Sequence, residues 1–95
     1  MARQSAGLLT DRTITSLSGA SQALLAANGQ RNYLLIENTG NANVGINLVG
    51  GTAIIGGAGT VTLTPNGSLE FVNWIPQGAI TVIGTSGQAL ACLEG

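Results

Sequence analysis

Apolar and polar residues alternate along most of this chain, and short turns rich in glycine, proline and asparagine separate the alternating segments. Alternation with a period of two is typical of β-strands, because successive side chains point to opposite faces of a sheet. Helical periodicity is absent from every long segment, and only residues 21–28 fit a turn or two of helix. The pattern predicts strands at Arg12–Leu17, Gln22–Ala26, Asn32–Asn38, Val44–Val49, Thr52–Ile55, Thr60–Thr64, Ser68–Asn73, Ala79–Ile83 and Ala89–Leu93.

Short strands with frequent turns are typical of an all-β sandwich or barrel. Asn66-Gly67 provides the positive φ that a tight hairpin turn needs. We therefore predict an all-β fold, a single-domain β-sandwich or jelly-roll-like barrel of about eight short strands, over residues 12–95. Residues 1–11 fit no strong strand pattern and are expected to form an N-terminal arm, flexible or swapped onto a neighbour, with Leu8 and Leu9 as apolar anchors.

The alternation also predicts which side chains face the core. Tyr33–Ile36 is apolar on both faces, as expected for a strand that is covered on each side by the fold itself or by a neighbouring subunit. Outward-facing neighbours are mostly neutral, and Thr62, Glu70 and Thr81 are expected on one outer surface with Thr60 and Ala91. The residues predicted to face inward are Val61, Leu63, Leu69, Phe71, Ile80, Val82, Leu90 and Cys92.

Charged residues make up only 7% of the 95 residues, against roughly 25% in typical soluble domains. The charges come from three arginines and four acids, and histidine is absent. Lysine and glutamate are depleted at interfaces, so their scarcity favours a protein whose faces are covered by partners. The alternative is poor solubility or a bias of composition without functional meaning.

Several classes of function are disfavoured by the same composition. The net charge is −1 and the arginines are scattered, whereas nucleic-acid binding needs clustered lysine and arginine. No apolar run approaches the ~20 residues of a membrane-spanning helix, and the N-terminal stretch lacks the pattern of a secretory signal peptide. The lone Cys92 excludes an internal disulfide and fits synthesis in a reducing cytoplasm, and its apolar surroundings predict a buried side chain.

The residue types present do not support catalysis or metal binding. Without histidine, neither a Ser-His-Asp nor a Cys-His arrangement is available within the chain. The glycine-rich segment 50–61 has no lysine and no following helix, so it does not fit a phosphate loop. We expect no enzymatic activity and no cofactor. The four carboxylates lack the spacing of a calcium loop and are expected to be solvated or paired with arginine: Asp11, Glu37, Glu70 and Glu94.

The remaining candidates are residues that bind other subunits. Trp74 leaves a strand toward a Pro-Gly turn, where it either contacts a partner or caps the end of the core. Arg31 is expected to pair with Glu37, Glu70 or a partner's carboxylate, and an exposed pair of this kind adds only about 0–1 kcal/mol. The predicted contact residues are Leu8, Leu9, Arg31, Tyr33, Glu70, Trp74 and Ile75.

One arrangement of strands and turns resembles a known group of proteins. Arg-Asn-Tyr-Leu-Leu-Ile-Glu-Asn at 31–38 is followed by a polar turn, by Val-Gly-Ile at 44–46 and by Gly-Gly at 50–51. With the stretches 63–71 and 84–95, the arrangement resembles small structural proteins of tailed bacteriophages over roughly residues 21–95. Many of these look like head decoration (cement) or head-fibre proteins.

The resemblance implies a β-sandwich or jelly-roll module, a homotrimer, that binds the major capsid protein on the outer surface of the virion after synthesis in the host cytoplasm. Repeated modest contacts on the lattice would then stabilise the shell. The alternative is a tail, fibre or adaptor component that binds a protein or glycan receptor, with Trp74 and the glycine-rich loop lining a shallow sugar site. A β-sandwich adhesin subunit is disfavoured by the missing signal pattern.

Overall fold

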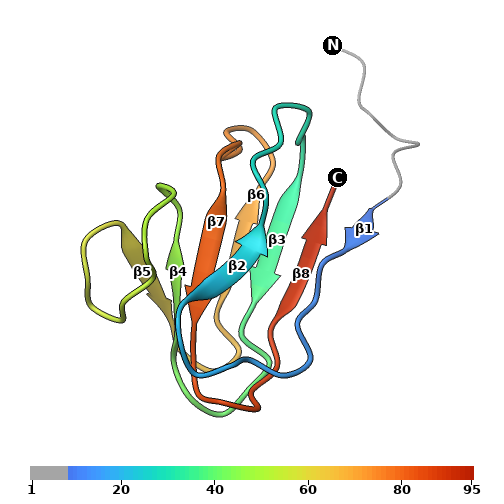
Figure 1. Cartoon of the computed structure of the whole chain (residues 1–95). Coiled ribbons are helices and arrows are strands. Elements are labelled where there is room, and N and C mark those ends of the chain that lie inside the picture. Colours follow the sequence, from blue (N-terminus) through green and yellow to red (C-terminus); the bar gives the residue numbers. More distant parts are fainter. Residues whose placement is uncertain (1–8) are drawn as a thin grey trace.

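The computed structural model describes residues 9–95, which form eight β-strands and no helix (Figure 1). The strands are short because turn residues recur every few positions. Among these residues no helix is long and apolar enough to cross a membrane. The strands are β1 (Thr10–Asp11), β2 (Gln22–Leu25), β3 (Leu34–Glu37), β4 (Val44–Asn47), β5 (Thr60–Leu63), β6 (Ser68–Phe71), β7 (Ile80–Ile83) and β8 (Ala91–Glu94).

The strands form two four-stranded antiparallel sheets, in the orders β1-β8-β3-β6 and β2-β7-β4-β5. The pairs β1·β8, β2·β7, β3·β6 and β4·β5 are those of one long hairpin whose tip is the connection between β4 and β5. Rolling up this hairpin adds the pairs β3·β8 and β4·β7, which complete the two sheets. This is the strand order of an eight-stranded jelly roll, and it confirms the predicted all-β sandwich.

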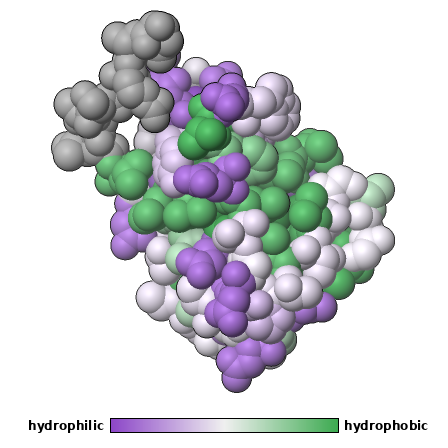
Figure 2. All heavy atoms as spheres, turned by 180° about the vertical axis from the view of Figure 1, so that it is seen from behind, coloured by the Kyte–Doolittle hydropathy of each residue, from purple (hydrophilic) through white to green (hydrophobic). Residues whose placement is uncertain are grey.

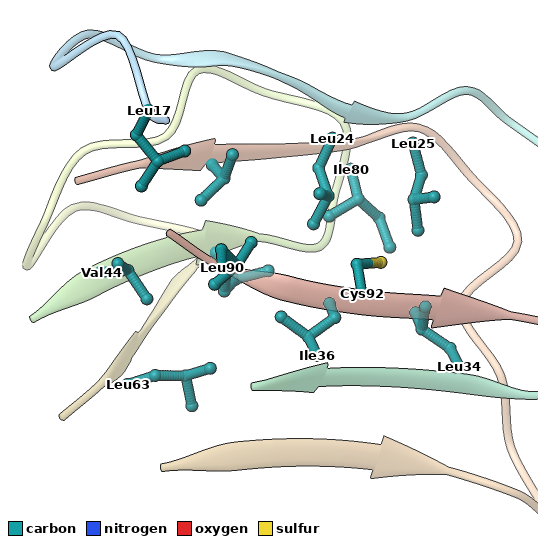
Figure 3. Close-up of a cluster of buried hydrophobic side chains, with 12 residues drawn as sticks. Leu17, Leu24, Leu25, Leu34, Ile36, Val44, Leu63, Ile80, Leu90 and Cys92 are labelled. Atoms are coloured by element: carbon teal, nitrogen blue, oxygen red, sulfur yellow. The ribbon is translucent and has the colours of Figure 1, made fainter. Parts of the chain in front are cut away.

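The core lies between the two sheets and consists of aliphatic side chains and one thiol. Figure 3 shows Leu24, Leu25 and Ile80 of one layer pointing toward Ile36 and Cys92 of the other. Fully burying one such aliphatic side chain contributes about 1.5–3 kcal/mol, so the hydrophobic effect fixes how the sheets face each other. The buried cluster comprises Leu17, Leu24, Leu25, Leu34, Ile36, Val44, Ile46, Leu63, Ile80, Val82, Leu90 and Cys92.

Most side chains that were predicted to face inward do so. Leu63, Ile80, Val82, Leu90 and Cys92 are buried, whereas Leu69 and Phe71 are partly buried and pack against the cluster. Val61 is the exception, because its side chain is 39% exposed. It lies on β5, an edge strand, where no further strand of its sheet covers it.

The prediction of one outer surface for Thr62, Glu70 and Thr81 is wrong. Thr62 and Thr81 lie on β5 and β7 of one sheet, whereas Glu70 lies on β6 of the other. The outer sides of two packed sheets point in opposite directions, so these residues occupy opposite faces of the molecule. Alternation along a strand predicts which side chains face the core and which face outward. It does not predict to which of the two sheets the strand belongs.

Two predicted strands are also wrong. Arg12–Leu17 has only an isolated bridge between Ile14 and Leu90, and β1 instead occupies Thr10–Asp11, within the predicted arm. Thr52–Ile55 is part of the loop between β4 and β5. The segment 21–28, which also fitted a helical turn, contains strand β2. The rest of the predicted arm, residues 1–8, lies outside the described residues.

Candidate assembly surfaces

The charged residues of the described chain all lie on or beside the β1-β8-β3-β6 sheet. They are Asp11, Arg12, Arg31, Glu37, Glu70 and Glu94. The outer side of the β2-β7-β4-β5 sheet, together with the loop 48–59 packed on it, carries no charged residue. We call this surface the neutral face. A partner that covers the neutral face buries no charged side chain of residues 9–95, so it avoids the large cost of removing an ion from water.

Asn47 of β4 fixes the loop 48–59 on the neutral face. Its buried amide donates to the carbonyl oxygen of Thr52 and to Oγ1 of Thr60, both at 3.3 Å. Its Oδ1 accepts from the backbone N–H groups of Val49 at 3.0 Å and Gly51 at 2.9 Å. The loop therefore takes its shape from one polar side chain rather than from strand pairing.

A glycine in β4 lets this loop lie close to the sheet. A Cβ on Gly45 would lie 2.8 Å from Cγ2 of Thr60 and 3.3 Å from Cγ1 of Ile55. The loop nevertheless leaves aliphatic side chains in water, with Val49 76%, Ile54 57% and Ile55 47% exposed. Exposed apolar groups of this kind are typical of interaction sites.

The opposite surface is the outer side of the β1-β8-β3-β6 sheet, which we call the acidic face. The register aligns Asp11 with Leu93, Leu93 with Leu35, and Leu35 with Glu70, in one row across the four strands. Leu35 was predicted to be covered, and it lies half-buried on this face. Figure 2, a view from behind that of Figure 1, shows a green apolar band across the middle of the surface with purple polar groups above and below it.

Tyr33 and Glu70, two predicted contact residues, meet on the acidic face. The Tyr33 hydroxyl donates to Oε2 of Glu70 at 2.8 Å. This hydrogen bond to the carboxylate, followed by partial burial and the negative charge, raises the pKa of the tyrosine. The tyrosine is therefore the neutral donor of this pair.

Trp74 protrudes from the connection between β6 and β7. Its side chain is 71% exposed, and its ring contacts Phe71 edge to face, with the centroids 6.4 Å apart. Val72 beside it is 51% exposed. Ile75 packs against the buried cluster instead, so Ile75 rather than Trp74 closes this part of the core.

Arg31 is buried, and its predicted pairing with Glu37 or Glu70 is wrong. Its Nε donates to Oε2 of Glu94 at 2.7 Å, and its side chain has 0% exposure. The same guanidinium donates to the carbonyl oxygens of Ala26, Pro76 and Gly78. A side chain enclosed in this way holds the fold together and offers no surface to a partner.

Glu94 accepts two further hydrogen bonds, from Nε of Arg12 and from the amide of Asn28, both at 3.1 Å. Burial by itself would raise the pKa of the Glu94 carboxyl, but the hydrogen bonds from Arg31, Asn28 and Arg12 outweigh it and lower the pKa. Glu94 is thus charged at neutral pH. It is paired with arginine, which is one of the two environments predicted for the four acids.

Cys92 is buried as predicted, and burial is the main cause that raises the pKa of its thiol to about 12. Within the described residues, no three His, Cys, Asp or Glu side chains are grouped so as to hold a metal ion. One cleft of about 330 Å³ is lined by residues 39–42 and 85–89, and another of about 240 Å³ lies between β2 and Arg12. The sugar-site alternative requires Trp74 and the glycine-rich loop to line a cleft, and neither of these clefts includes them.

The structure thus distributes the predicted contact residues over several regions. Leu9 is 52% exposed beside β1, and Leu8 lies outside the described residues. Tyr33 and Glu70 come together, Trp74 stands apart from them, and Arg31 is removed to the interior. Sequence reasoning missed the loop residues Val49, Ile54 and Ile55, although segment 38–69 contains no charged residue and signalled a neutral surface.

Comparisons with known proteins bear on the fold alone. No protein-family model matches the sequence, and no curated protein matches it. Among solved structures, the chain is similar to a protein described under "Bacillus endospore appendages form a novel family of disulfide-linked pili". The TM-score is 0.51 at 16% sequence identity, over 98% of this chain and 90% of that one.

Proposed function

We propose that this chain is a virion structural protein, a capsid decoration protein that binds the outer surface of the major capsid shell and stabilises it. The observation that carries the proposal is the neutral face, on which exposed aliphatic side chains occur without any charged residue. Depletion of charge in the centre of a contact surface is the compositional mark of protein interfaces. The resemblance of segment 31–38 and its surroundings to phage structural proteins supports the shell as the partner.

The architecture suits a role that consists of binding. Two packed sheets give rigid faces, and the loops at their ends present Trp74 and the aliphatic residues of loop 48–59. A single face of this size binds only modestly, but many copies on a lattice add their contacts through multivalency. In this proposal the protein is made in the host cytoplasm, assembles with itself as a homotrimer, and then occupies the virion surface.

Electron cryo-microscopy of the virion whose genome encodes this chain tests the proposal. The expected result is density for the jelly roll on the outer shell, with the neutral face or the Trp74 loop against a neighbouring subunit. Density confined to the tail would overturn the decoration role and support the tail, fibre or adaptor alternative. Absence of the chain from the virion would overturn both.

A second candidate is a subunit of a filament formed by copies of this chain, and the structural similarity to a pilus protein favours it. That protein is described as part of disulfide-linked pili, whereas Cys92 here is buried and needs the core to open before it can form a bond between copies. Negative-stain microscopy of the purified chain distinguishes the candidates. Filaments that persist in a reducing agent would support this one, and discrete particles would count against it.

A further inference from the structure

The acidic face has an apolar centre and a carboxylate at each edge. Leu35 and Leu93 lie side by side on β3 and β8, and Asp11 and Glu70 flank them on the outermost strands. With neighbouring strands ~4.8 Å apart, the row spans about 14 Å. Glu37 lies further along β3 on the same face, opposite Ala91.

No cation of the described chain neutralises these carboxylates. Glu70 accepts the Tyr33 hydroxyl, Asp11 accepts the backbone N–H of Thr13 at 3.0 Å, and neither of them nor Glu37 forms an ion pair within residues 9–95. Both arginines described there belong to another site. Arg31 is buried, and Arg12 pairs with Glu94 and lines the cleft beside β2.

An apolar centre with a charged rim is the usual anatomy of a protein interface. The charges here restrict which partner fits. Two copies that met through this face would bring six carboxylates together without a cation from residues 9–95, and like-charge juxtaposition at an interface is unfavourable. A surface with arginine or lysine around an apolar centre would instead pair with every carboxylate of the row.

We infer that the acidic face binds a different protein, through a surface with an apolar centre and a rim of arginine or lysine, and does not bind a second copy of this chain. This inference goes beyond the proposed function, which rests on the neutral face, and assigns a second partner to the opposite surface. Leu35 and Leu93 provide the desolvated contact, and Asp11, Glu37 and Glu70 provide the selectivity.

A variant of the chain itself can provide the partner surface, an apolar centre with a basic rim. A copy with Asp11→Lys, Glu37→Lys and Glu70→Lys has the same apolar centre and a basic rim. Sedimentation velocity is measured for the parent, for the reversed copy, and for their equimolar mixture. We expect a one-to-one complex in the mixture that neither protein forms alone, with a dissociation constant at least roughly tenfold larger at high salt than at low salt.

Two controls test whether the complex depends on the acidic face or only on opposite net charge. In the first, Thr15, Ser16, Thr52, Thr62, Thr64 and Thr85, all exposed, are replaced by Lys, which adds six positive charges as the three reversals do. In the second, the parent carries Leu35→Ser. Both are expected to lose the complex. Three outcomes would overturn the inference. The six-lysine copy could bind the parent as tightly as the reversed copy does, the Leu35→Ser parent could bind the reversed copy unchanged, or no complex could form at all.

If the reversed copy does not fold, neutralisation provides the test. The parent with Asp11→Asn, Glu37→Gln and Glu70→Gln is expected to self-associate where the parent does not, because repulsion between the rims is removed. Unchanged association would overturn the inference. These measurements need no virion, so a tail location found by microscopy would refute the decoration role without affecting them.

Discussion

Arg31 joins more segments of the chain than any surface residue described above. Its guanidinium reaches the end of β2 through Ala26, the connection between β6 and β7 through Pro76 and Gly78, and β8 through Glu94. A buried guanidinium is tolerated only where its donors find acceptors, and here they do. Arg31, in the connection between β2 and β3, thus ties both sheets together at one end of the sandwich.

Removing the partner carboxylate should be costly at this position. Glu94→Ala leaves the buried Arg31 charge uncompensated, and we expect the free energy of unfolding to fall by about 3–5 kcal/mol. Urea unfolding followed by circular dichroism measures it. Glu70→Ala, which removes an exposed carboxylate, is the matched control and should change stability by only about 0.5 kcal/mol. Equal effects of the two variants would contradict the structural role of the pair.

The same pair should make stability depend on pH. Hydrogen bonds hold the folded pKa of Glu94 below its ordinary value of 4.5, so the unfolded chain takes up the proton first as the pH falls. The stabilisation is complete above about pH 4.5 and is lost as the pH falls through the folded pKa. Urea midpoints of the parent and of Glu94→Gln, measured from neutral pH to pH 3, should therefore converge on acidification. A constant difference across this range would contradict the assignment.

At the scale of elements, the loop 48–59 depends on one side chain. Asn47→Ala removes hydrogen bonds to Thr52, Thr60, Val49 and Gly51, and we expect a loss of about 1–3 kcal/mol. Hydrogen exchange should accelerate in the loop amides while strands β3 and β8 remain protected. Asn43→Ala, at an exposed position before β4, is the control and should leave the loop unchanged. Faster exchange spread evenly over the chain would indicate general destabilisation instead.

This loop also shows where prediction from sequence ends. Thr52–Ile55 has the composition of a strand, but its backbone groups bond to side chains instead of to a neighbouring strand. The Thr52 carbonyl oxygen accepts from the Asn47 amide, and the N–H groups of Ala53 and Ile54 donate to the hydroxyls of Ser21 and Thr60. Seven of the predicted strands overlap an observed strand because their alternation is regular and turn residues bound them. Arg12–Leu17 failed because the chain there crosses from one sheet toward the other. Arg12, Ile14 and Leu17 form separate backbone hydrogen bonds to residues 88–92, and only Ile14 forms a β-bridge.

The candidate surfaces were less predictable than the strands. Proximity of Tyr33 to Glu70 depends on β3 pairing with β6, a contact between segments distant in sequence. The pairing of Arg31 with Glu94 has the same origin, since it joins residues 63 positions apart. Composition gave the scarcity of charge, but only the sheet order shows that the charged residues of the described chain lie on or beside one sheet.

For the whole molecule, the exposed aromatic and aliphatic side chains should matter to assembly and little to folding. Replacing Trp74 by Ala and Val72 by Ser removes two exposed groups, so the free energy of unfolding should change by at most about 1 kcal/mol. Loading of the variant onto shells that lack this protein should be weakened at least roughly tenfold if these residues anchor the contact. Val82→Ala is the contrasting variant, because it should cost about 1–3 kcal/mol in the core. Normal loading of the Trp74 variant would exclude this loop as an anchor.

The rolled hairpin also governs when the molecule acquires its structure during synthesis. β8 lies between β1 and β3 in its sheet, yet seven other strands precede it along the chain. A nascent chain that ends before Ala91 therefore lacks an inner strand, and β1 has no partner. Contacts between such distant segments form slowly and late. We therefore expect prematurely terminated chains to stay unfolded and open to proteases, and the jelly roll to form only after β8 has been translated.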